Sequence, residues 1–207
     1  MQIVCLDLEG VLIPEVWIEF SRATKIPELA RTTRDEPDYD KLMRARIAIL
    51  EKHGLGLPAI QAVISQMRPL EGAKEFLDEL RGRHQVVILS DTYYEFAAPL
   101  MAQLGRPTLF CHKLVIDGTG RVTGYKLRMK DQKRAAVTKF RELNFQTIAA
   151  GDSYNDVSML AAAHAGILFC PPENVVKEFP QYPVTRDYAA LAGEIERASM
   201  AISGPAP

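Results

Sequence analysis

Carboxylates, amides and hydroxyls follow three separate apolar runs of this sequence. Asp7 and Glu9 follow the first run, Ser90 and Asp91 follow the second, and Asp152, Asn155 and Asp156 follow the third. Carboxylates that lie close together repel one another and raise each other's pKa unless a cation neutralises them. Oxygen ligands without His or Cys favour a hard divalent cation, first of all Mg²⁺. If the fold brings these groups together, they predict a magnesium site.

Lys133 supplies the opposite charge. It lies in the first turn of a helix expected to begin near Asp131, where the helix dipole disfavours a cation, so helix stability does not explain its position. One interpretation is that Lys133 and Ser90 bind phosphate oxygens opposite the metal. The alternatives are a solvated lysine in a basic stretch, and a helix-capping role for Ser90 or Asn155.

Four short runs that are apolar at every position predict strands covered on both faces of a parallel sheet. They are Ile3–Leu6, Val86–Leu89, Ile148–Ala150 and Gly166–Cys170. Helical periodicity lies between them, around Phe76–Leu80, Phe96–Leu104 and Ala136–Leu143. This alternation predicts a doubly wound, Rossmann-like α/β sheet. Ligands bind at the carboxyl ends of the strands in such a sheet, so the polar groups above should converge there.

The connection between the first two predicted strands is much longer than the dozen or so residues that a crossover needs. Its three helical patterns are near Glu15–Ala30, Asp40–His53 and Pro58–Gln66. We therefore expect residues 15–67 to form a small helical cap on a core domain of residues 1–14 and 68–207. Alternating residues around Asp117-Gly118-Thr119-Gly120 predict a β-hairpin from Leu109 to Leu127.

The composition is that of an ordinary globular domain, with 47% hydrophobic and 25% charged residues among 207, which excludes a disordered, collagen-like or coiled-coil chain. A net charge of −1 predicts neither nucleic-acid nor membrane binding. The three cysteines have no metal-site or disulfide spacing and predict reduced thiols, with Cys5 and Cys170 buried in apolar runs. The sequence predicts a cytoplasmic protein, with the hairpin as a candidate homodimer interface.

The polar groups occur in the order of the four motifs of the haloacid dehalogenase superfamily of phosphohydrolases, which this sequence resembles. The motifs are Asp7-Leu8-Glu9-Gly10-Val11, Ser90, Lys133 and Gly151-Asp152-Ser153-Tyr154-Asn155-Asp156. Over nearly its whole length the chain resembles the phosphoserine phosphatases, above all the bacterial kind that is also a phosphoserine:homoserine phosphotransferase. The resemblance implies a Mg²⁺-dependent enzyme of serine and threonine biosynthesis that acts on L-phosphoserine, with water or L-homoserine as acceptor.

The resemblance also implies the catalytic roles. Asp7 is the nucleophile that forms an aspartyl-phosphate, and Glu9 is the general acid and then the general base. Mg²⁺ is held by the Asp7 carboxylate, the Glu9 backbone carbonyl and Asp152. Asp156 holds the metal's water ligands or Lys133 in place without itself being a metal ligand.

The remaining predicted site residues bind the substrate. Ser90 and Lys133 hold the transferring phosphoryl group, and Asn155 contacts the phosphate or the substrate. Glu15 resembles the glutamate that meets the substrate ammonium, and Arg46 the arginine that binds its carboxylate as a fork. The alternatives are that Glu15 is a stabilising acid in the first turn of a helix and that Arg46 is an exposed helical cation.

Two positions depart from the family pattern. Glu9 stands where the family has Asp, which lengthens the arm of the general acid. Ser90 is followed by Asp91-Thr92-Tyr93, where phosphoserine phosphatases usually continue with two glycines. Asp91 is therefore included among the predicted substrate-binding residues.

Three other functions fit part of the sequence. A phosphatase for another small phosphate monoester shares the motifs, although Glu15 with Arg46 favours a zwitterionic amino acid. An aspartate-phosphorylated receiver module is also doubly wound and binds Mg²⁺, but it lacks an inserted cap and carries its Asp on a later strand. A dinucleotide-binding module is disfavoured because no glycine-rich fingerprint follows the first strand.

Overall fold

The protein, described here by a computed structural model of residues 1–32, 35–36 and 38–203, contains one seven-stranded sheet. The strands are β1 (Gln2–Leu6), β2 (Gln85–Tyr93), β3 (Leu109–Ile116), β4 (Val122–Lys126), β5 (Gln146–Gly151), β6 (Ala165–Phe169) and β7 (Val184–Thr185). Their spatial order is β4-β3-β2-β1-β5-β6-β7. All neighbours are parallel except β3 and β4, which form the predicted hairpin.

The longer helices are α1 (Val16–Thr24), α2 (Tyr39–Lys52), α3 (Leu57–Ile64), α4 (Ala73–Arg83), α5 (Tyr94–Gln103), α6 (Gln132–Glu142) and α9 (Tyr188–Ser203). The shorter ones are η1 (Pro27–Ala30), η2 (Tyr154–Asp156), α7 (Val157–Ala162) and α8 (Glu173–Glu178). The predicted helix Glu15–Ala30 is thus two pieces. Lys25 ends α1 in a left-handed conformation with φ 58°, and Pro27 starts a separate turn.

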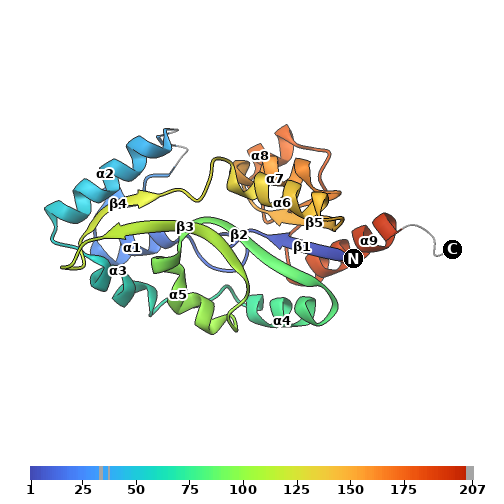
Figure 1. The fold of residues 1–207 in the computed structure, drawn as a ribbon, viewed down its shortest axis with the longest axis horizontal. Helices are drawn as coiled ribbons and strands as arrows, with labels where there is room; N and C mark the ends of the chain where they lie inside the picture. The colour runs from blue at the N-terminus through green and yellow to red at the C-terminus, as the bar shows by residue number, and fades with distance from the viewer. Residues whose placement is uncertain (33–34, 37, 204–207) are drawn as a thin grey trace.

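Side chains of the central strand enter two separate hydrophobic cores. Val4 and Leu6 pack with residues of α4, α5 and α9, whereas Ile3 and Cys5 pack with residues of α6, α7 and α8. Successive residues of a strand point to opposite faces, so the fully apolar run of β1 reflects burial on both sides. Figure 1 shows α4 and α6–α8 on opposite sides of the sheet, which confirms the doubly wound α/β fold.

The strand order reverses direction at β1. From β1 the chain continues to β2 on one side, and it later returns to β5 on the other side. At such a switch point the crossovers leave in opposite directions and a crevice opens beyond the strand ends. Asp7 lies at this point, where its N–H still donates to the carbonyl of Ala150 at 2.9 Å.

Helix α2 packs against the hairpin, and Figure 1 shows it running beside β4. The Tyr125 hydroxyl donates to Asp40 Oδ1 at 2.6 Å, and the Leu57 N–H donates to the Gly120 carbonyl at 2.8 Å. These two hydrogen bonds join α2 and α3 to the hairpin.

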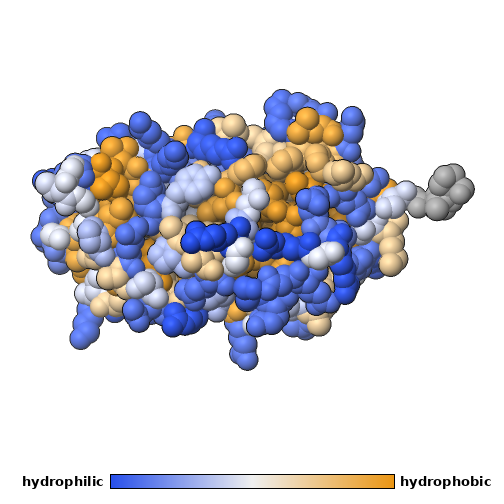
Figure 2. Space-filling view, turned by 60° about the horizontal axis from the view of Figure 1, so that its bottom comes forward, coloured by the Kyte–Doolittle hydropathy of each residue, from blue (hydrophilic) through white to orange (hydrophobic). Residues whose placement is uncertain are grey.

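Two of the three free cysteines, Cys5 and Cys111, are buried, whereas Cys170 is exposed. The prediction that Cys170 is buried is wrong because β6 ends at Phe169 and Cys170 follows in a turn with φ 46°. On the face drawn in Figure 2, hydrophilic residues cover much of the surface, with hydrophobic residues in areas between them. Among the described residues no single helix is long and apolar enough to cross a membrane, and α2 with α3 meets that test only as a pair bent by 101°.

Candidate active site

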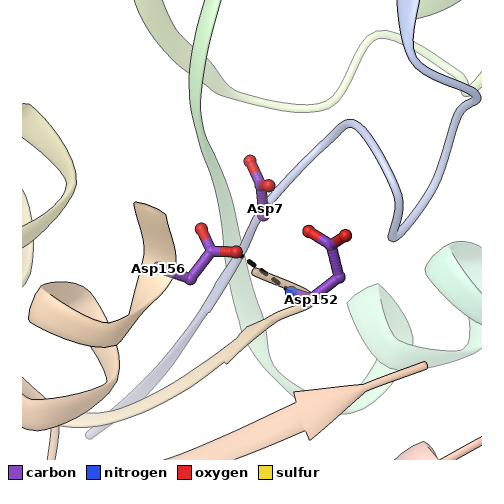
Figure 3. Close-up of side chains that lie close together, drawn as sticks. All are labelled: Asp7, Asp152 and Asp156. Atoms are coloured by element: carbon purple, nitrogen blue, oxygen red, sulfur yellow. Dashed lines mark hydrogen bonds between the residues drawn. The ribbon is translucent and has the colours of Figure 1, made fainter. Parts of the chain in front are cut away.

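Three acids from two strand ends meet beyond the sheet (Figure 3). Asp7 follows β1, and Asp152 and Asp156 follow β5. Each offers a carboxylate oxygen, and these oxygens lie within 4.8 Å of one another. An all-oxygen, anionic donor set of this size fits a hard divalent cation.

Two glycines allow this close approach. Gly10 has φ +78°, and a Cβ atom there would lie 2.6 Å from Asp152 Cγ. A Cβ on Gly151 would overlap the Asp156 carboxylate. The glycines in the first and last motifs are therefore required by the packing of the two acids.

Lys133 balances part of the negative charge. Its Nζ lies 2.7 Å from Asp7 Oδ1 and 2.8 Å from Asp156 Oδ1, and its side chain is 4% exposed. Burial lowers the pKa of Lys133, but the carboxylates of Asp156 and Asp7 outweigh burial and hold this pKa well above its usual value. These contacts explain a cation in the first turn of α6, so the solvated-lysine interpretation is wrong.

Ionisation of two of these acids, Asp7 and Asp152, is unfavourable in the folded protein. Burial, and then the charge of Asp156, raise the pKa of Asp7 well above its ordinary value, although Lys133 opposes this. The same two causes, burial first, raise the pKa of Asp152 to about 7. A divalent cation bound here would favour the ionised forms of these acids.

Asp156, unlike the other two acids, is fully buried. Its Oδ1 meets Lys133, while its Oδ2 accepts hydrogen bonds from the N–H groups of Asp152 and Ser153 at 3.0 and 3.1 Å. Both oxygens are thus occupied by the protein. This geometry suits a residue that orients Asp152 and Lys133, and its predicted supporting role stays a prediction.

Glu9 joins the first motif to the first cap helix. Its Oε2 accepts a hydrogen bond at 3.1 Å from the N–H of Val16, the first residue of α1. Burial, and then the neighbouring charge of Glu15, raise the pKa of Glu9 to about 8, while the Thr92 hydroxyl lowers it. A glutamate at this position reaches the helix N-terminus, so its extra length has a structural use.

Strand β2 extends beyond the predicted run and contains Ser90 and Asp91. Leu89 pairs with Phe110 and Tyr93 pairs with His112. Between these two pairs β2 is four residues further along its chain, whereas β3 is only two residues further along. The intervening residues form a bulge, a device that re-aims side chains next to sites. Ser90 Oγ accepts from the N–H of Thr92 at 3.2 Å and lies in a strand, so the helix-capping interpretation of Ser90 is wrong.

A cavity of about 360 Å³ covers these groups. Nine of the ten predicted site residues line it, namely Asp7, Glu9, Glu15, Arg46, Ser90, Asp91, Lys133, Asp152 and Asn155. The tenth, Asp156, is fully buried and does not line the cavity. The structure therefore brings together residues from both ends of the chain and from the cap segment.

Arg46 is 6% exposed, so the interpretation as an exposed helical cation is wrong. Its guanidinium stacks 4.5 Å from the Trp17 ring centroid, and one terminal nitrogen donates to the Arg31 carbonyl at 2.6 Å. No described residue accepts a hydrogen bond from its Nε, which is buried. Arg46 also lines the cavity, and a guanidinium there is suited to a carboxylate ligand.

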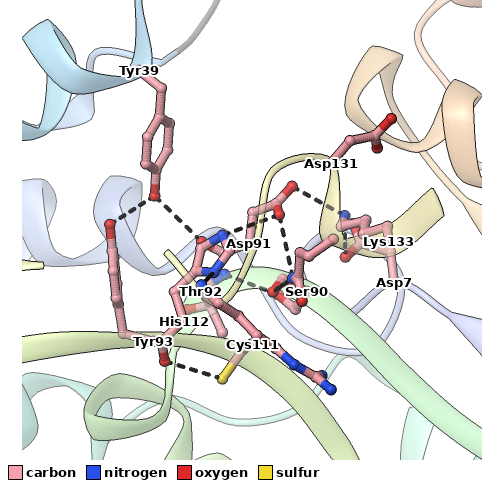
Figure 4. A network of polar contacts seen from close by, with 12 residues as sticks. Asp7, Tyr39, Ser90, Asp91, Thr92, Tyr93, Cys111, His112, Asp131 and Lys133 are labelled. Atoms are coloured by element: carbon pink, nitrogen blue, oxygen red, sulfur yellow. Dashed lines mark hydrogen bonds and ion pairs between the residues drawn. The ribbon is translucent and has the colours of Figure 1, made fainter. Parts of the chain in front are cut away.

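Three residues around Ser90 were not predicted from the sequence, and Figure 4 labels two of them, Thr92 and His112. Gln132 is buried and its amide nitrogen donates to the Ser90 carbonyl. Buried His112 lies 3.5 Å from Asp91 Oδ1, and Thr92 contacts Glu9. Gln132 stands beside the motif lysine, which was a usable signal, whereas no spacing rule links His112 to Asp91.

The family model of the haloacid dehalogenase-like hydrolases matches residues 1–164. The chain belongs to this hydrolase family. "Phosphoserine phosphatase ThrH" of Pseudomonas aeruginosa is 61% identical over 96% of this chain and 97% of that protein. A "Phosphoserine phosphatase" of Pseudomonas syringae pv. tomato is 59% identical over 96% of this chain and 84% of that protein. The family predicted from the motifs is confirmed.

Solved structures confirm the fold of this hydrolase. A substrate-bound phosphoserine phosphatase complex has a TM-score of 0.77 at 20% identity and covers 93% of this chain and 97% of that one. A phospho-aspartyl intermediate analogue of phosphoserine phosphatase has a TM-score of 0.76 at 21% identity, with 93% and 98% covered. The match to a hydrolase family also removes the receiver and dinucleotide-binding alternatives.

Proposed function

We propose that this hydrolase is a Mg²⁺-dependent phosphoserine phosphatase that forms an aspartyl-phosphate on Asp7 and also transfers the phosphoryl group to homoserine. The observation that carries the proposal is that two sets of groups line one cavity. Asp7 and Lys133 suit a phosphoryl group, and Glu15 and buried Arg46 bring opposite charges to the same cavity. A phosphate ester of a small zwitterion matches both sets, and the relatives named above support it.

In the first half-reaction the Asp7 carboxylate attacks phosphorus while the bond from phosphorus to the serine oxygen breaks. Ser90 and Lys133 bind the non-bridging phosphoryl oxygens, since both line the cavity beside Asp7. Glu9, whose pKa burial raises to about 8, gives its proton to the departing serine oxygen.

Asp7, Asp152 and the Glu9 carbonyl would hold Mg²⁺, with Asp156 supporting them. The ion would supply positive charge that offsets the repulsion between the phosphate and the carboxylates. Its fit rests on the donor set, in which three acids with closely spaced oxygens are only partly balanced by Lys133.

In the second half-reaction the oxygen of water or homoserine attacks phosphorus and releases Asp7. Glu9, now a carboxylate, takes the proton of that attacking hydroxyl. Glu15 would meet the ammonium and Arg46 the carboxylate of either amino acid, and residues 15–67 would act as a cap domain that shields the phosphoenzyme. The serine and threonine pathways, a cytoplasmic location and a homodimer stay predictions of the sequence.

The test is phosphate release from a panel of monoesters, with and without homoserine. We expect phosphoserine to be preferred over phosphothreonine, phosphoethanolamine and phosphoglycolate, and homoserine to divert product into phosphohomoserine. Preference for an ester that lacks either the ammonium or the carboxylate would support the alternative of another small-monoester phosphatase.

A further inference from the structure

Asp91 occupies a bulge position at the wall of the phosphoryl cavity. Its Oδ1 faces two donors, the Gln132 amide at 3.3 Å and His112 Nε2 at 3.5 Å. Its Oδ2 faces Lys133 Nζ at 3.8 Å, and no described residue donates a hydrogen bond to Oδ2. The carboxylate is therefore fixed by donors through Oδ1, whereas Oδ2 has only the longer ion-pair contact with Lys133.

His112 is held in one tautomer. The N–H of Arg128 donates to His112 Nδ1 at 3.1 Å, so Nδ1 carries no proton and the proton of the neutral ring is on Nε2, facing Asp91. The ring is 4% exposed. Figure 4 shows the resulting chain from His112 through Asp91 to Lys133.

A carboxylate at this position needs a function, because it competes with the phosphoryl group for Lys133. Burial raises the pKa of Asp91, but Lys133 and then His112 lower it to about 2, so Asp91 is ionised at neutral pH. Its side chain is 39% exposed, and its Oδ2 can accept a hydrogen bond from a molecule in the cavity. The bulge contributes no other anion to the cavity wall.

We propose that Asp91 is an acceptor-binding residue whose Oδ2 takes a hydrogen bond from the ammonium of the molecule that attacks the phosphoenzyme, with His112 as its positioning residue. The ligand class is a small amino alcohol. This inference rests on the proposed function, because it concerns the second half-reaction of the same cavity.

The step is balanced without a further reactant. The acceptor oxygen bonds to phosphorus as the bond from phosphorus to Asp7 breaks, and the acceptor's hydroxyl proton passes to Glu9. Asp91 exchanges no proton in this step. It orients the acceptor beside Ser90, which holds the phosphoryl oxygens.

The experiment measures how phosphoserine turnover divides between phosphohomoserine and free phosphate as homoserine is varied. This partition does not depend on how fast the intermediate forms. Asp91→Asn and Asp91→Gly should raise the half-saturating homoserine concentration about ten- to a hundredfold, as for loss of a charged hydrogen bond. Exchange of labelled serine into phosphoserine gives a second acceptor, on which the same rise is expected.

His112 offers a matched pair of variants. Gln places its amide nitrogen near the position of Nε2 and should retain the wild-type partition. Asn can still accept from the Arg128 N–H but cannot reach Asp91, so His112→Asn should shift the partition in the same direction as Asp91→Asn. In the Asp91→Gly background His112→Asn should cause no further shift. Thermal unfolding checks that each variant is folded.

Unchanged half-saturating concentrations for both acceptors in the two Asp91 variants would overturn the inference. Equal shifts of the product partition by His112→Asn in the wild-type enzyme and in Asp91→Gly would overturn the positioning role of His112. Failure of the proposed function is a separate result, in which the wild-type enzyme releases no phosphate from phosphoserine. If the wild type hydrolyses phosphoserine without transfer to homoserine, serine exchange decides the inference.

Discussion

Gly10→Ala perturbs the metal site through one methyl group. Gly10 has φ +78°, and the new Cβ would lie 2.6 Å from Asp152 Cγ. Ordinary contacts begin at 3.4 Å, so the carboxylate must retreat by about 0.8 Å, the difference between these two distances. Mg²⁺ requires ligands at about 2.0–2.1 Å in near-ideal geometry, so Asp152 could no longer bind it together with Asp7.

Two effects are expected from this change. The left-handed conformation costs an alanine about 1–2 kcal/mol, which a domain with about 5–15 kcal/mol of stability survives. The displaced ligand should weaken Mg²⁺ binding about ten- to a hundredfold, the usual effect of disturbing a metal ligand's support.

Gly54→Ala is the matched control. Gly54 also has a left-handed conformation, with φ +63°, but a Cβ there would have no neighbour within 4 Å. It should therefore lose similar stability and keep wild-type Mg²⁺ dependence. The assay is phosphate release from phosphoserine titrated with Mg²⁺, with thermal unfolding in parallel. Equal Mg²⁺ midpoints for the two variants would refute the packing argument.

Three further predictions concern charge. Lys133→Met leaves two buried carboxylates unpaired and should lower the free energy of unfolding, measured in urea, by about 3–5 kcal/mol. Lys139 lies in the same helix with its side chain 72% exposed, so Lys139→Met should lower it by only about 0–1 kcal/mol. Arg46→Ala should raise KM for phosphoserine about ten- to a hundredfold and change KM for p-nitrophenyl phosphate far less. With a chelator, the melting temperature should fall as pH rises from about 4 to about 7, because the pKa values of Asp7 and Asp152 are raised in the folded state and the unfolded chain ionises first. Mg²⁺ should restore more stability at pH 8 than at pH 5.

Each of these three predictions has a result that would contradict it. Similar losses in the two lysine variants would mean that the Lys133 ion pairs contribute little net stability. Parallel KM changes on both substrates would make Arg46 a packing residue. A metal-free melting temperature that rises over the same pH range would mean that the site acids are not held at raised pKa values.

Several parts of the architecture were predictable because they follow from burial and chain connectivity. Fully apolar runs predict strands covered on both faces, and β1, β5 and β6 lie where these runs predict them. Parallel strands place their carboxyl ends at one edge, so acids near Asp7 and Asp152 had to approach each other. The position of Lys133, unfavourable for its helix, correctly indicated a partner elsewhere in the fold.

The details around Ser90 depend on pairing that the sequence does not encode locally. The extension of β2 to Tyr93 and its bulge result from the register against β3, which brings His112 beside Asp91. The exposure of Cys170 depends on where β6 ends, and an apolar run does not fix its last residue. Burial of Arg46 requires Trp17 and the Arg31 carbonyl to meet it from another helix and loop.

The most direct test of the proposed chemistry is capture of the phosphoenzyme. Enzyme mixed with phosphoserine and Mg²⁺ is quenched in acid within milliseconds, and the labelled peptide is located by mass spectrometry. Our account predicts one acyl-phosphate, on Asp7, that is absent from folded Asp7→Asn. Phosphate on another residue, or turnover of phosphoserine by Asp7→Asn free of deamidated protein, would contradict it.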